Sequence, residues 1–272
     1  MQFARYPSLE NRSVFVTGGA SGIGFGLARA LGRRGGRVLI AEPDEARLEA
    51  AVRRLGTHGV DAAYATCDVT DLSQVEVLAD RAWDVLGGVD MVFNNAGIGI
   101  PQAKLVDTAM DDLHRVFDVN FFGVWHGCRV FTPRLIAQGT PAGIYNTGSE
   151  NSVFNAVPDF AAYIASKHAV LGLTENLREQ VPDFIHVGLI LPGFVMSGLT
   201  EDSSETPMDT DRFVSIALRQ IGDGRFFIVS HAYNKVRIQQ RYDELLRAFD
   251  EYAPRYDGDD EFDIRTLLAK GK

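Results

Sequence analysis

The stretch that decides the fold is Val14-Phe15-Val16-Thr17-Gly18-Gly19-Ala20-Ser21-Gly22-Ile23-Gly24. Its first four residues form a β-branched and aromatic run typical of a strand, and a glycine-rich turn that opens a helix follows. Glycine lets the backbone turn tightly and approach a pyrophosphate at the N-terminus of that helix. The order of strand, turn and helix predicts a dinucleotide-binding unit, although the spacing Gly-x-x-x-Gly-x-Gly differs from the commoner Gly-x-Gly-x-x-Gly.

Apolar runs rich in β-branched residues alternate with segments of helical period along most of the chain. The predicted strands are 13–17, 37–41, 62–66, 91–94, 143–147, 186–191 and 226–229, and the predicted helices are 22–34, 45–55, 72–86, 110–137 and 160–180. This alternation implies right-handed βαβ units in a parallel sheet. We therefore predict an α/β fold: a doubly wound parallel sheet of about seven strands with helices on both faces, in a single Rossmann domain that spans residues 1–272.

Two segments do not fit this alternation. Residues 198–211 are rich in Ser, Thr and acidic side chains and follow the carboxyl end of a predicted strand, where ligands bind in such sheets. We expect a substrate lid there, with an ordinary exposed loop as the alternative. A further amphipathic helix is expected at about 233–249, and residues 251–272, with the acidic run 257–261, are expected to form a solvated C-terminal tail.

The composition disfavours several functional classes. The 272 residues are 46% hydrophobic and 23% charged, which is typical of a soluble globular protein, and the net charge of −9 argues against a nucleic-acid surface. Cys67 and Cys128 have no metal-ligand spacing, so neither a metal site nor a disulfide framework is expected. Residues 1–10 lack the pattern of a signal peptide, and no apolar run approaches the ~20 residues of a membrane span. We therefore expect a cytoplasmic protein without membrane partners.

The second predicted strand is followed at once by an acid, Glu42. In a dinucleotide-binding fold, an acid at this place accepts hydrogen bonds from the adenosine ribose hydroxyls. Its charge repels the 2′-phosphate of NADP, and Ser21 offers no charge that could bind this phosphate, so NAD is the expected cofactor. Arg33, Arg34 and Arg37 lie close in sequence and keep NADP as the alternative. A surface acid without a ligand is the alternative for Glu42.

A phenol and an ammonium group stand four residues apart in Tyr163-Ile164-Ala165-Ser166-Lys167. On a helix, this spacing places both side chains on one face. A free phenol titrates near pH ~10, and a nearby positive charge lowers that pKa. The pair could therefore act as a general acid or base for a substrate hydroxyl or carbonyl. A solvated helix face with the same two residues is the alternative.

These motifs belong to an ordered series along the chain: Thr17-Gly18-x-x-x-Gly22-Ile23-Gly24, Cys67-Asp68-Val69-Thr70, Asn94-Asn95-Ala96-Gly97, Asn120, Ser149, Tyr163-x-x-x-Lys167 and Pro192-Gly193-Phe194-Val195. In this series the chain resembles the short-chain dehydrogenase/reductase family, from about Arg12 to Ser197. The resemblance implies cofactor contacts at Gly18, Ser21, Gly22, Ile23, Gly24, Glu42, Asp68, Val69, Asn95, Ala96, Gly97, Tyr163, Lys167, Pro192, Gly193 and Val195. The alternatives are helix caps at Asp68 and Asn94 and a plain strand end at Pro192.

The resemblance also implies a catalytic tetrad of Asn120, Ser149, Tyr163 and Lys167. Tyr163 would exchange the proton with the substrate oxygen, and Ser149 would orient that oxygen. Lys167 would lower the pKa of Tyr163 and bind the nicotinamide ribose. Asn120 would hold a water molecule that links Lys167 to solvent.

Ser149 lies one residue further from Tyr163 than is commonest in the family, and Glu150 stands at the commoner distance. An ionised carboxylate cannot donate a hydrogen bond to a carbonyl oxygen. We therefore assign the role to Ser149 and infer a one-residue insertion in the loop that follows it. Ser152 is the weaker alternative. Glu150 is expected either to face the substrate or to be a solvated loop acid.

Signals for the substrate are mostly apolar. Side chains expected near the mouth of the site, besides Glu150, are Phe154, Val157, Phe160, Phe194, Met196 and Leu199. This set favours a hydrophobic or aromatic secondary alcohol or ketone, and ordinary core packing is the alternative. The sequence thus predicts an NAD-dependent oxidoreductase that interconverts a secondary alcohol and a ketone. An NADPH-dependent carbonyl reductase and a non-catalytic dinucleotide sensor are the alternatives.

The family resemblance further implies a homodimer or homotetramer. The long helices around Asn120 and Tyr163 would form the common dimer face of the family. The chain departs from the family pattern near its end, because residues 224–231 stand where many relatives have a glycine-rich closing strand. The second contact surface of the usual tetramer is therefore in doubt from the sequence.

Overall fold

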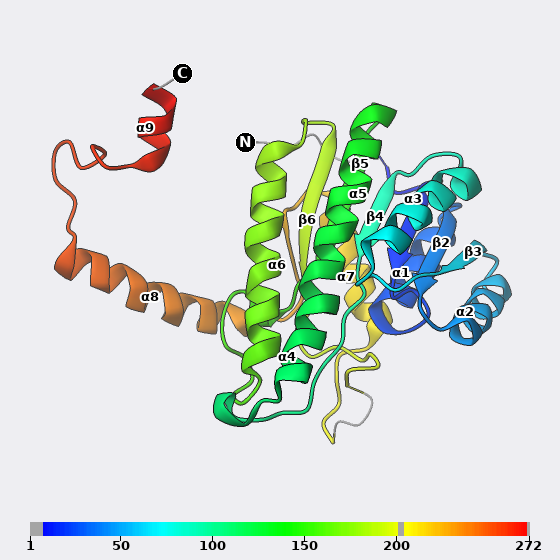
Figure 1. The fold of residues 1–272 in the computed structure, drawn as a ribbon, viewed down its shortest axis with the longest axis horizontal. Helices are drawn as coiled ribbons and strands as arrows, with labels where there is room; N and C mark the ends of the chain where they lie inside the picture. Colours follow the sequence, from blue (N-terminus) through cyan, green and yellow to red (C-terminus); the bar gives the residue numbers. More distant parts are fainter. Residues whose placement is uncertain (1–7, 201–203, 271–272) are drawn as a thin grey trace. The chain divides into compact units, whose positions relative to one another are not determined.

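The computed structural model describes residues 8–200 and 204–270, and Figure 1 shows its ribbon. Within these residues, seven parallel strands form one sheet in the order β3-β2-β1-β4-β5-β6-β7. The strands are β1 (Ser13–Thr17), β2 (Arg37–Glu42), β3 (Asp61–Thr66), β4 (Met91–Asn94), β5 (Ala142–Thr147), β6 (Ile185–Leu191) and β7 (Phe227–Val229). The predicted doubly wound parallel sheet is confirmed.

Helices cover both faces of the sheet. One face packs against α1 (Gly22–Gly32), α2 (Glu45–Thr57) and α7 (Thr210–Gly222), and the other packs against α3 (Leu72–Leu86), α5 (Gly123–Gln138) and α6 (Ala161–Gln180). In Figure 1, α5 and α6 run side by side across one face. The central strands β4, β5 and β6 are buried at every residue, because helices exclude water from both of their faces.

Local chemistry sets the ends of several helices. The side chain of Asp44 caps α2 by accepting a hydrogen bond from the Arg47 amide (3.1 Å), and Asp71 caps α3 in the same way. Gly87 ends α3 in the left-handed conformation, which glycine adopts without steric cost. The helices therefore begin close to where the sequence predicted them.

Two predicted boundaries are wrong. The expected helix 110–137 is divided into α4 (Met110–Phe117) and α5 by a π-helical turn, η2 (Asp118–Phe122). Such a turn widens the helix locally and occurs often at functional sites, and here it contains Asn120. The sequence analysis also missed α7, so the segment 198–211 ends inside a helix that begins at Thr210. Residues 201–203 of that segment lie outside the described residues.

The order of the strands reverses between β1 and β4, which are neighbours in the sheet although two strands separate them in sequence. The chain leaves β1 toward β2 and leaves β4 toward β5, so the loops after β1 and β4 diverge. In open α/β sheets, the crevice at the carboxyl ends of the strands beside such a reversal is where ligands bind. The fold therefore places the glycine-rich turn and the segment after Asn94 at one binding edge.

A buried chain of polar side chains holds α6 on the sheet. The amide of Asn94 donates to the Asn146 side-chain oxygen (2.8 Å), and the Asn146 amide donates to the hydroxyl of Thr174 on α6 (3.0 Å). All three side chains are buried, so each hydrogen bond replaces water that the group lost on folding. Because α6 also carries Tyr163 and Lys167, this chain helps to set the position of both relative to β5.

The chain separates into two compact units, one ending at His231 and the other starting at Ala232. The sequence analysis treated residues 1–272 as one domain with a tail from 251. The second unit contains a long helix, α8 (Asn234–Tyr252), which confirms the helix expected at about 233–249, and a short one, α9 (Ile264–Lys270), within the expected tail. Every residue of α8 is described, and none of them is buried.

Among the described residues, none of the helices is both long and apolar enough to span a bilayer. The same residues contain no cluster of three or more His, Cys, Asp or Glu side chains that could hold a metal ion. Both cysteines, Cys67 and Cys128, are buried and free.

The buried polar chain predicts the effect of Asn146→Ala. Removing this side chain leaves the Asn94 amide and the Thr174 hydroxyl without their partner, so we expect the free energy of unfolding to fall by about 2–4 kcal/mol. Urea denaturation measures it. The matched control is Asn176→Ala on the exposed side of α6, which should change the free energy by about 0.5 kcal/mol or less. Equal losses in the two variants would contradict the role of the chain.

Candidate active site

A cavity of about 620 Å³ opens at the carboxyl edge of the sheet. Its wall is formed by the segments that follow β1, β2, β3, β4, β5 and β6, together with the first turns of α6. Most of the predicted site residues line it: Gly18, Ser21, Gly22, Ile23, Glu42, Asp68, Val69, Asn95, Ala96, Gly97, Ser149, Glu150, Tyr163, Lys167, Pro192, Gly193, Phe194, Val195 and Leu199. Four predicted residues do not line it: Gly24, Asn120, Phe154 and Met196.

The glycine-rich turn meets the cavity at the N-terminus of α1. Gly22 has a φ of +51°, a conformation that residues with a side chain rarely adopt, and a Cβ there would lie 3.0 Å from Cβ of Ser197. Gly24 faces away from the cavity, and a Cβ there would collide with the carbonyl oxygen of Gly18. Gly24 therefore permits the close packing of α1 against the turn rather than contacting a ligand.

The carboxylate of Glu42 lies at one end of the cavity, and one of its oxygens has no hydrogen-bond donor within the described part of the chain. Its Oε1 is buried and 3.4 Å from Nε of Arg47, without hydrogen-bond geometry. The same arginine donates from Nη2 to the Ser21 hydroxyl (3.1 Å). Burial raises the pKa of Glu42, whereas Arg47 and the Ala20 amide lower it. A buried acceptor without a donor suits a ligand that brings hydroxyl groups.

The cations proposed from sequence as NADP ligands lie elsewhere. Arg37 donates from Nη2 to the carbonyl oxygen of Leu86, and Arg34 donates to the Ala30 carbonyl oxygen (3.0 Å). Neither these two nor Arg33 lines the cavity. The sequence analysis missed Arg47, which lines the cavity beside Ser21. Its signal was its place in the first turn of the helix that follows Glu42.

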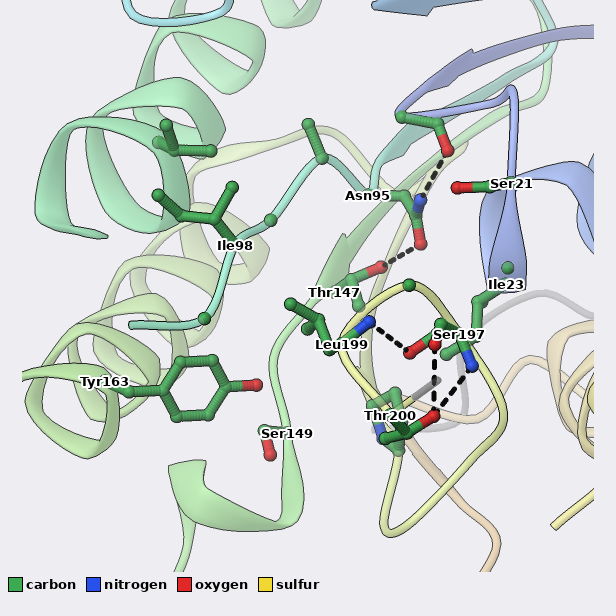
Figure 2. Close-up of a pocket in the computed structure, with 18 of the residues that line it drawn as sticks. Ser21, Ile23, Asn95, Ile98, Thr147, Ser149, Tyr163, Ser197, Leu199 and Thr200 are labelled. Atoms are coloured by element: carbon green, nitrogen blue, oxygen red, sulfur yellow. Dashed lines mark hydrogen bonds between the residues drawn. The ribbon is translucent and has the colours of Figure 1, made fainter. Parts of the chain in front are cut away.

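A hydroxyl that the sequence analysis overlooked organises the segment after β4. Oγ1 of Thr17, the last residue of β1, accepts hydrogen bonds from the amides of Asn95 (2.9 Å) and Ala96 (3.0 Å). The side chain of Asn95 donates to the Thr17 carbonyl oxygen (3.1 Å) and accepts from the Thr147 hydroxyl (3.3 Å). The predicted cofactor residue Asn95 thus links the ends of β1, β4 and β5 at the cavity wall (Figure 2).

The adenine end of the predicted site is partly built from Asp68 and Val69. One carboxylate oxygen of Asp68, Oδ1, accepts from the amide (2.9 Å) and the hydroxyl (2.8 Å) of Thr70. Asp68 is exposed and Val69 is buried, and both line the cavity. The local turn fixes the direction of the Asp68 side chain at the cavity wall.

Tyr163 and Ser149 meet at the other end of the cavity. Figure 2 shows the Tyr163 ring, carried by α6, reaching toward the end of β5 where Ser149 lies. Behind them, Lys167 donates from Nζ to the Thr147 carbonyl oxygen (3.0 Å), and only 3% of the lysine is exposed. The predicted helical face therefore exists, with the phenol and the ammonium group on the same side of α6 and a strand carbonyl holding the lysine.

Asn120 lies behind the wall rather than on it. Its side-chain oxygen accepts from the Ile98 amide (2.8 Å), and its amide donates to the Ile98 carbonyl oxygen (3.0 Å). A Cβ at Gly97 would be 3.3 Å from Oδ1 of Asn120 and 3.5 Å from Nζ of Lys167. Asn120 thus fixes the backbone beside the lysine, and the bonds of the π-helical turn orient it there.

Burial dominates the titration of the two central side chains. The pKa of Tyr163 is raised by burial, lowered by the Ser149 hydroxyl and raised by the Glu150 carboxylate. Burial lowers the pKa of Lys167 to about 8. The expectation that Lys167 brings the pKa of Tyr163 below its ordinary value is wrong for this structure. The phenol is withdrawn from water, and the lysine nitrogen lies 5.7 Å from the centre of its ring.

The loop after β5 distinguishes the two candidate serines. Ser149 caps a short helical turn, η3 (Glu150–Ser152), by accepting from the Asn151 amide (3.1 Å), and it lines the cavity. Ser152 is fully buried and accepts from the Ser149 amide (3.1 Å). Ser152 therefore supports the serine that faces the cavity. Glu150 also faces the cavity, and a Cβ at Gly193 would lie 2.8 Å from its Oε2.

Apolar side chains line the part of the cavity nearest Tyr163. Leu199 and Phe160 both lie close to Gly99, where a Cβ would be 3.4 Å and 3.8 Å from them. The sequence analysis placed Phe154 and Met196 here as well. Phe154 is instead buried behind the wall, and Met196 is 48% exposed.

The segment that carries Leu199 is held at both ends. The Met196 amide donates to the carbonyl oxygen of Met208, and the Met208 amide donates to that of Phe194 (both 2.9 Å). The hydroxyl of Thr200 also accepts from the Ser197 amide (2.9 Å). These bonds place Ser197 against the glycine-rich turn and Leu199 over the apolar part of the cavity.

Comparison with known proteins identifies the class of enzyme. The short chain dehydrogenase family matches residues 12–208. The chain is 34% identical over 248 residues to the 1-deoxy-11-beta-hydroxypentalenate dehydrogenase of Streptomyces avermitilis, covering 88% of this chain and 92% of the relative. It is 34% identical to the mitochondrial borneol dehydrogenase of Lavandula x intermedia over 196 residues, 71% of this chain and 73% of that one.

A solved structure agrees with these relatives. A short chain dehydrogenase/reductase from Burkholderia phymatum in complex with NAD has a TM-score of 0.82 and 27% identity to this chain, covering 91% of this chain and 98% of that one. The chain therefore belongs to the short-chain dehydrogenase family. It is a short-chain dehydrogenase/reductase of the NAD(P)-dependent kind that acts on CH–OH donors.

The arrangement of the two serines predicts unequal effects of their replacement. Ser149→Ala removes the hydroxyl that faces the cavity, so kcat should fall by roughly 100-fold. Ser152→Ala removes a buried support and should lower kcat by much less, with a loss of stability instead. Steady-state kinetics and thermal denaturation of both variants measure these effects. A larger loss of kcat in Ser152→Ala than in Ser149→Ala would contradict the assignment of Ser149 as the serine that contacts the substrate oxygen.

Proposed function

We propose that this enzyme interconverts a secondary alcohol and a ketone of a hydrophobic or aromatic small molecule, with NAD as cofactor and Tyr163 as general acid/base. One observation carries the proposal: a single cavity extends from Glu42, whose buried Oε1 has no hydrogen-bond donor among the described residues, to Tyr163 and Ser149. Such a cavity suits an extended ligand with a ribose at the first end and a reacting carbon at the second.

The residues at the wall fit a dinucleotide. Glu42 would accept hydrogen bonds from the adenosine ribose hydroxyls. These hydroxyls would be the donors that its buried Oε1 lacks among the described residues. The N-terminus of α1, opened by Gly18 and Gly22, would hold the pyrophosphate. Asp68 and Val69 would bind the adenine, and Pro192, Gly193 and Val195 the nicotinamide. When bound, NAD supplies the acceptor for the hydride.

The protein's own groups handle the proton. In oxidation, Tyr163 as phenolate takes the proton of the substrate hydroxyl while the Ser149 hydroxyl donates to the same oxygen. In reduction, the phenol returns that proton to the new alkoxide. Lys167, held by the Thr147 carbonyl oxygen, would bind the nicotinamide ribose beside Tyr163. Asn120 fixes the backbone of Ile98 next to this lysine.

A specific observation favours NADP as a second candidate. Arg47 lies between Ser21 and Glu42 and lines the cavity, so it could bind a 2′-phosphate. The proposal keeps NAD, because the carboxylate of Glu42 at the end of β2 would repel that phosphate. Arg47 then serves to hold the Glu42 carboxylate and the Ser21 hydroxyl in place.

The substrate class follows from the apolar end of the cavity. Val157, Phe160, Phe194 and Leu199 line it near Tyr163, together with Glu150 as a polar exception. Such a wall suits a bulky apolar substrate with one polar contact. The relatives act on 1-deoxy-11-beta-hydroxypentalenate and borneol according to their names. The segment 198–211 would cover the substrate as a lid, and the bridge between Val195 and Met208 holds the chain beside it.

The proposal extends to the oligomeric state and the cellular location of the enzyme. The exposed side chains of Met110, Phe122 and Trp125 lie on α4, η2 and α5, around Asn120. They suit the dimer face that the family resemblance implies, in a homodimer or homotetramer. The proposed location is the cytoplasm.

Replacing Tyr163 tests the proton transfer. In Tyr163→Phe, kcat should fall at least ~100-fold while the affinity for NAD, measured by titration, stays within about twofold. In the wild-type enzyme, alcohol oxidation should accelerate as pH rises through the alkaline range, because the raised pKa of Tyr163 keeps the phenolate scarce at neutral pH. Any residual activity of the variant should lack this rising limb. A variant that keeps more than about a tenth of wild-type kcat would refute the assignment.

Cofactor preference is tested at Glu42 and Arg47. Values of kcat/KM for NAD and NADP should favour NAD in the wild-type enzyme, and Glu42→Ala should narrow the difference mainly by weakening NAD. Adding Ser21→Arg should improve NADP further. Arg47→Ala is the matched control: under the proposal it affects NAD more than NADP. A wild-type preference for NADP that Arg47→Ala abolishes would establish the second candidate instead.

A further inference from the structure

The second unit presents an apolar stripe that its own residues leave exposed. On α8, Ile238, Tyr242, Leu245, Phe249 and Tyr252 follow one another at alternating intervals of four and three residues, which places them on one face of the helix. Leu245 and Phe249 are 49% and 56% exposed. This pattern is the seam by which one helix packs against another.

A helix of this kind gains its stability from packing of the apolar face rather than from its length alone. The structure describes every residue of α8, and none of them is buried. The stripe is continuous over almost the whole helix and contains three aromatic rings. Contiguous exposed apolar surface of this kind marks an interaction site.

The charges on α8 indicate which partner fits. Its first half carries Lys235, Arg237 and Arg241, and its second half carries Asp243, Glu244, Arg247, Asp250 and Glu251. The first half is therefore positive and the second half is negative, with no net charge over the helix. A second α8 laid antiparallel brings each positive half against a negative half, whereas a parallel one brings like charges together. The lack of net positive charge disfavours an anionic membrane.

The apolar stripe has the same self-complementarity. In an antiparallel pair, the two alternating seam positions face each other, so Tyr242 packs opposite Leu245 of the second copy and Ile238 packs opposite Phe249 of the second copy. One two-fold axis near the middle of α8 relates both pairs. The charges and the stripe therefore select the same arrangement.

We propose that α8 is a dimerisation element that pairs antiparallel with α8 of a second copy of this chain. It shares no residue with the face around Asn120 and Trp125. The pairing involves no residue of the cavity, so it stands independently of the proposed reaction. It follows the region 224–231, where the chain departs from the family's closing strand.

Cysteine cross-linking of the full chain tests both the partner and the direction. Ile238→Cys and Phe249→Cys are made separately, with the buried Cys67 and Cys128 retained. Mixing the two variants under mild oxidation should give a disulfide between them, because the positions face each other. Either variant alone should give none, because identical positions lie about 16 Å apart along an antiparallel pair, beyond the ~7 Å between Cα atoms that a disulfide spans.

Gln240→Cys is the matched control, since it lies on the opposite face of α8, and it should not cross-link with Phe249→Cys. Cross-linking of each variant with itself would overturn the proposal in favour of a parallel pair. In a second measurement, Leu245→Glu should halve the mass of the assembly in light scattering while kcat stays unchanged. An unchanged mass of the Leu245→Glu variant would overturn the proposal. So would a result in which Leu245→Glu abolishes binding of the protein to anionic vesicles and leaves its mass unchanged.

Discussion

The site depends on one physical constraint: Lys167 must keep a polar partner although it is buried. Its ammonium group is withdrawn from water and donates to the Thr147 carbonyl oxygen at the end of β5. An unpaired charge in such a place would be costly, so α6 and β5 must keep their positions relative to each other. The chain of hydrogen bonds from Asn94 through Asn146 to Thr174 fixes these positions from within the core. Stability and chemistry therefore share the same contacts.

The two ends of the cavity use burial in different ways. At one end, burial raises the pKa of the Glu42 carboxyl while Arg47 opposes this effect, and an acceptor is left ready for a donor. At the other end, burial raises the pKa of Tyr163 and lowers that of Lys167. Withdrawal from water thus makes the Tyr163 phenol hold its proton more tightly and the Lys167 ammonium group hold its proton less tightly, so the pKa of the phenol exceeds that of the lysine. The reversal of strand order between β1 and β4 is what places both ends on one edge of the sheet.

The second unit follows a different principle. The α/β core buries its apolar side chains between the sheet and two layers of helices, whereas α8 leaves its apolar stripe exposed. An enzyme domain and an association element can then change separately, because the cavity and the stripe share no residues. The departure from the family's closing motif lies where the chain passes from the first unit to the second.

The sequence by itself determined the α/β class, the alternation of strands and helices and most of the residues at the cavity, because hydrophobic period and glycine-rich turns act over a few residues. The run from Val14 to Gly24 and the pair Tyr163 and Lys167 are local signals of this kind. The tertiary structure alone decided that Arg47 reaches Ser21, that Thr17 holds the segment after β4, and that Gly24 packs rather than binds. It also decided the direction of the Tyr163 pKa. These properties depend on distance through space and on exclusion of water, which arise when segments far apart in the sequence pack together.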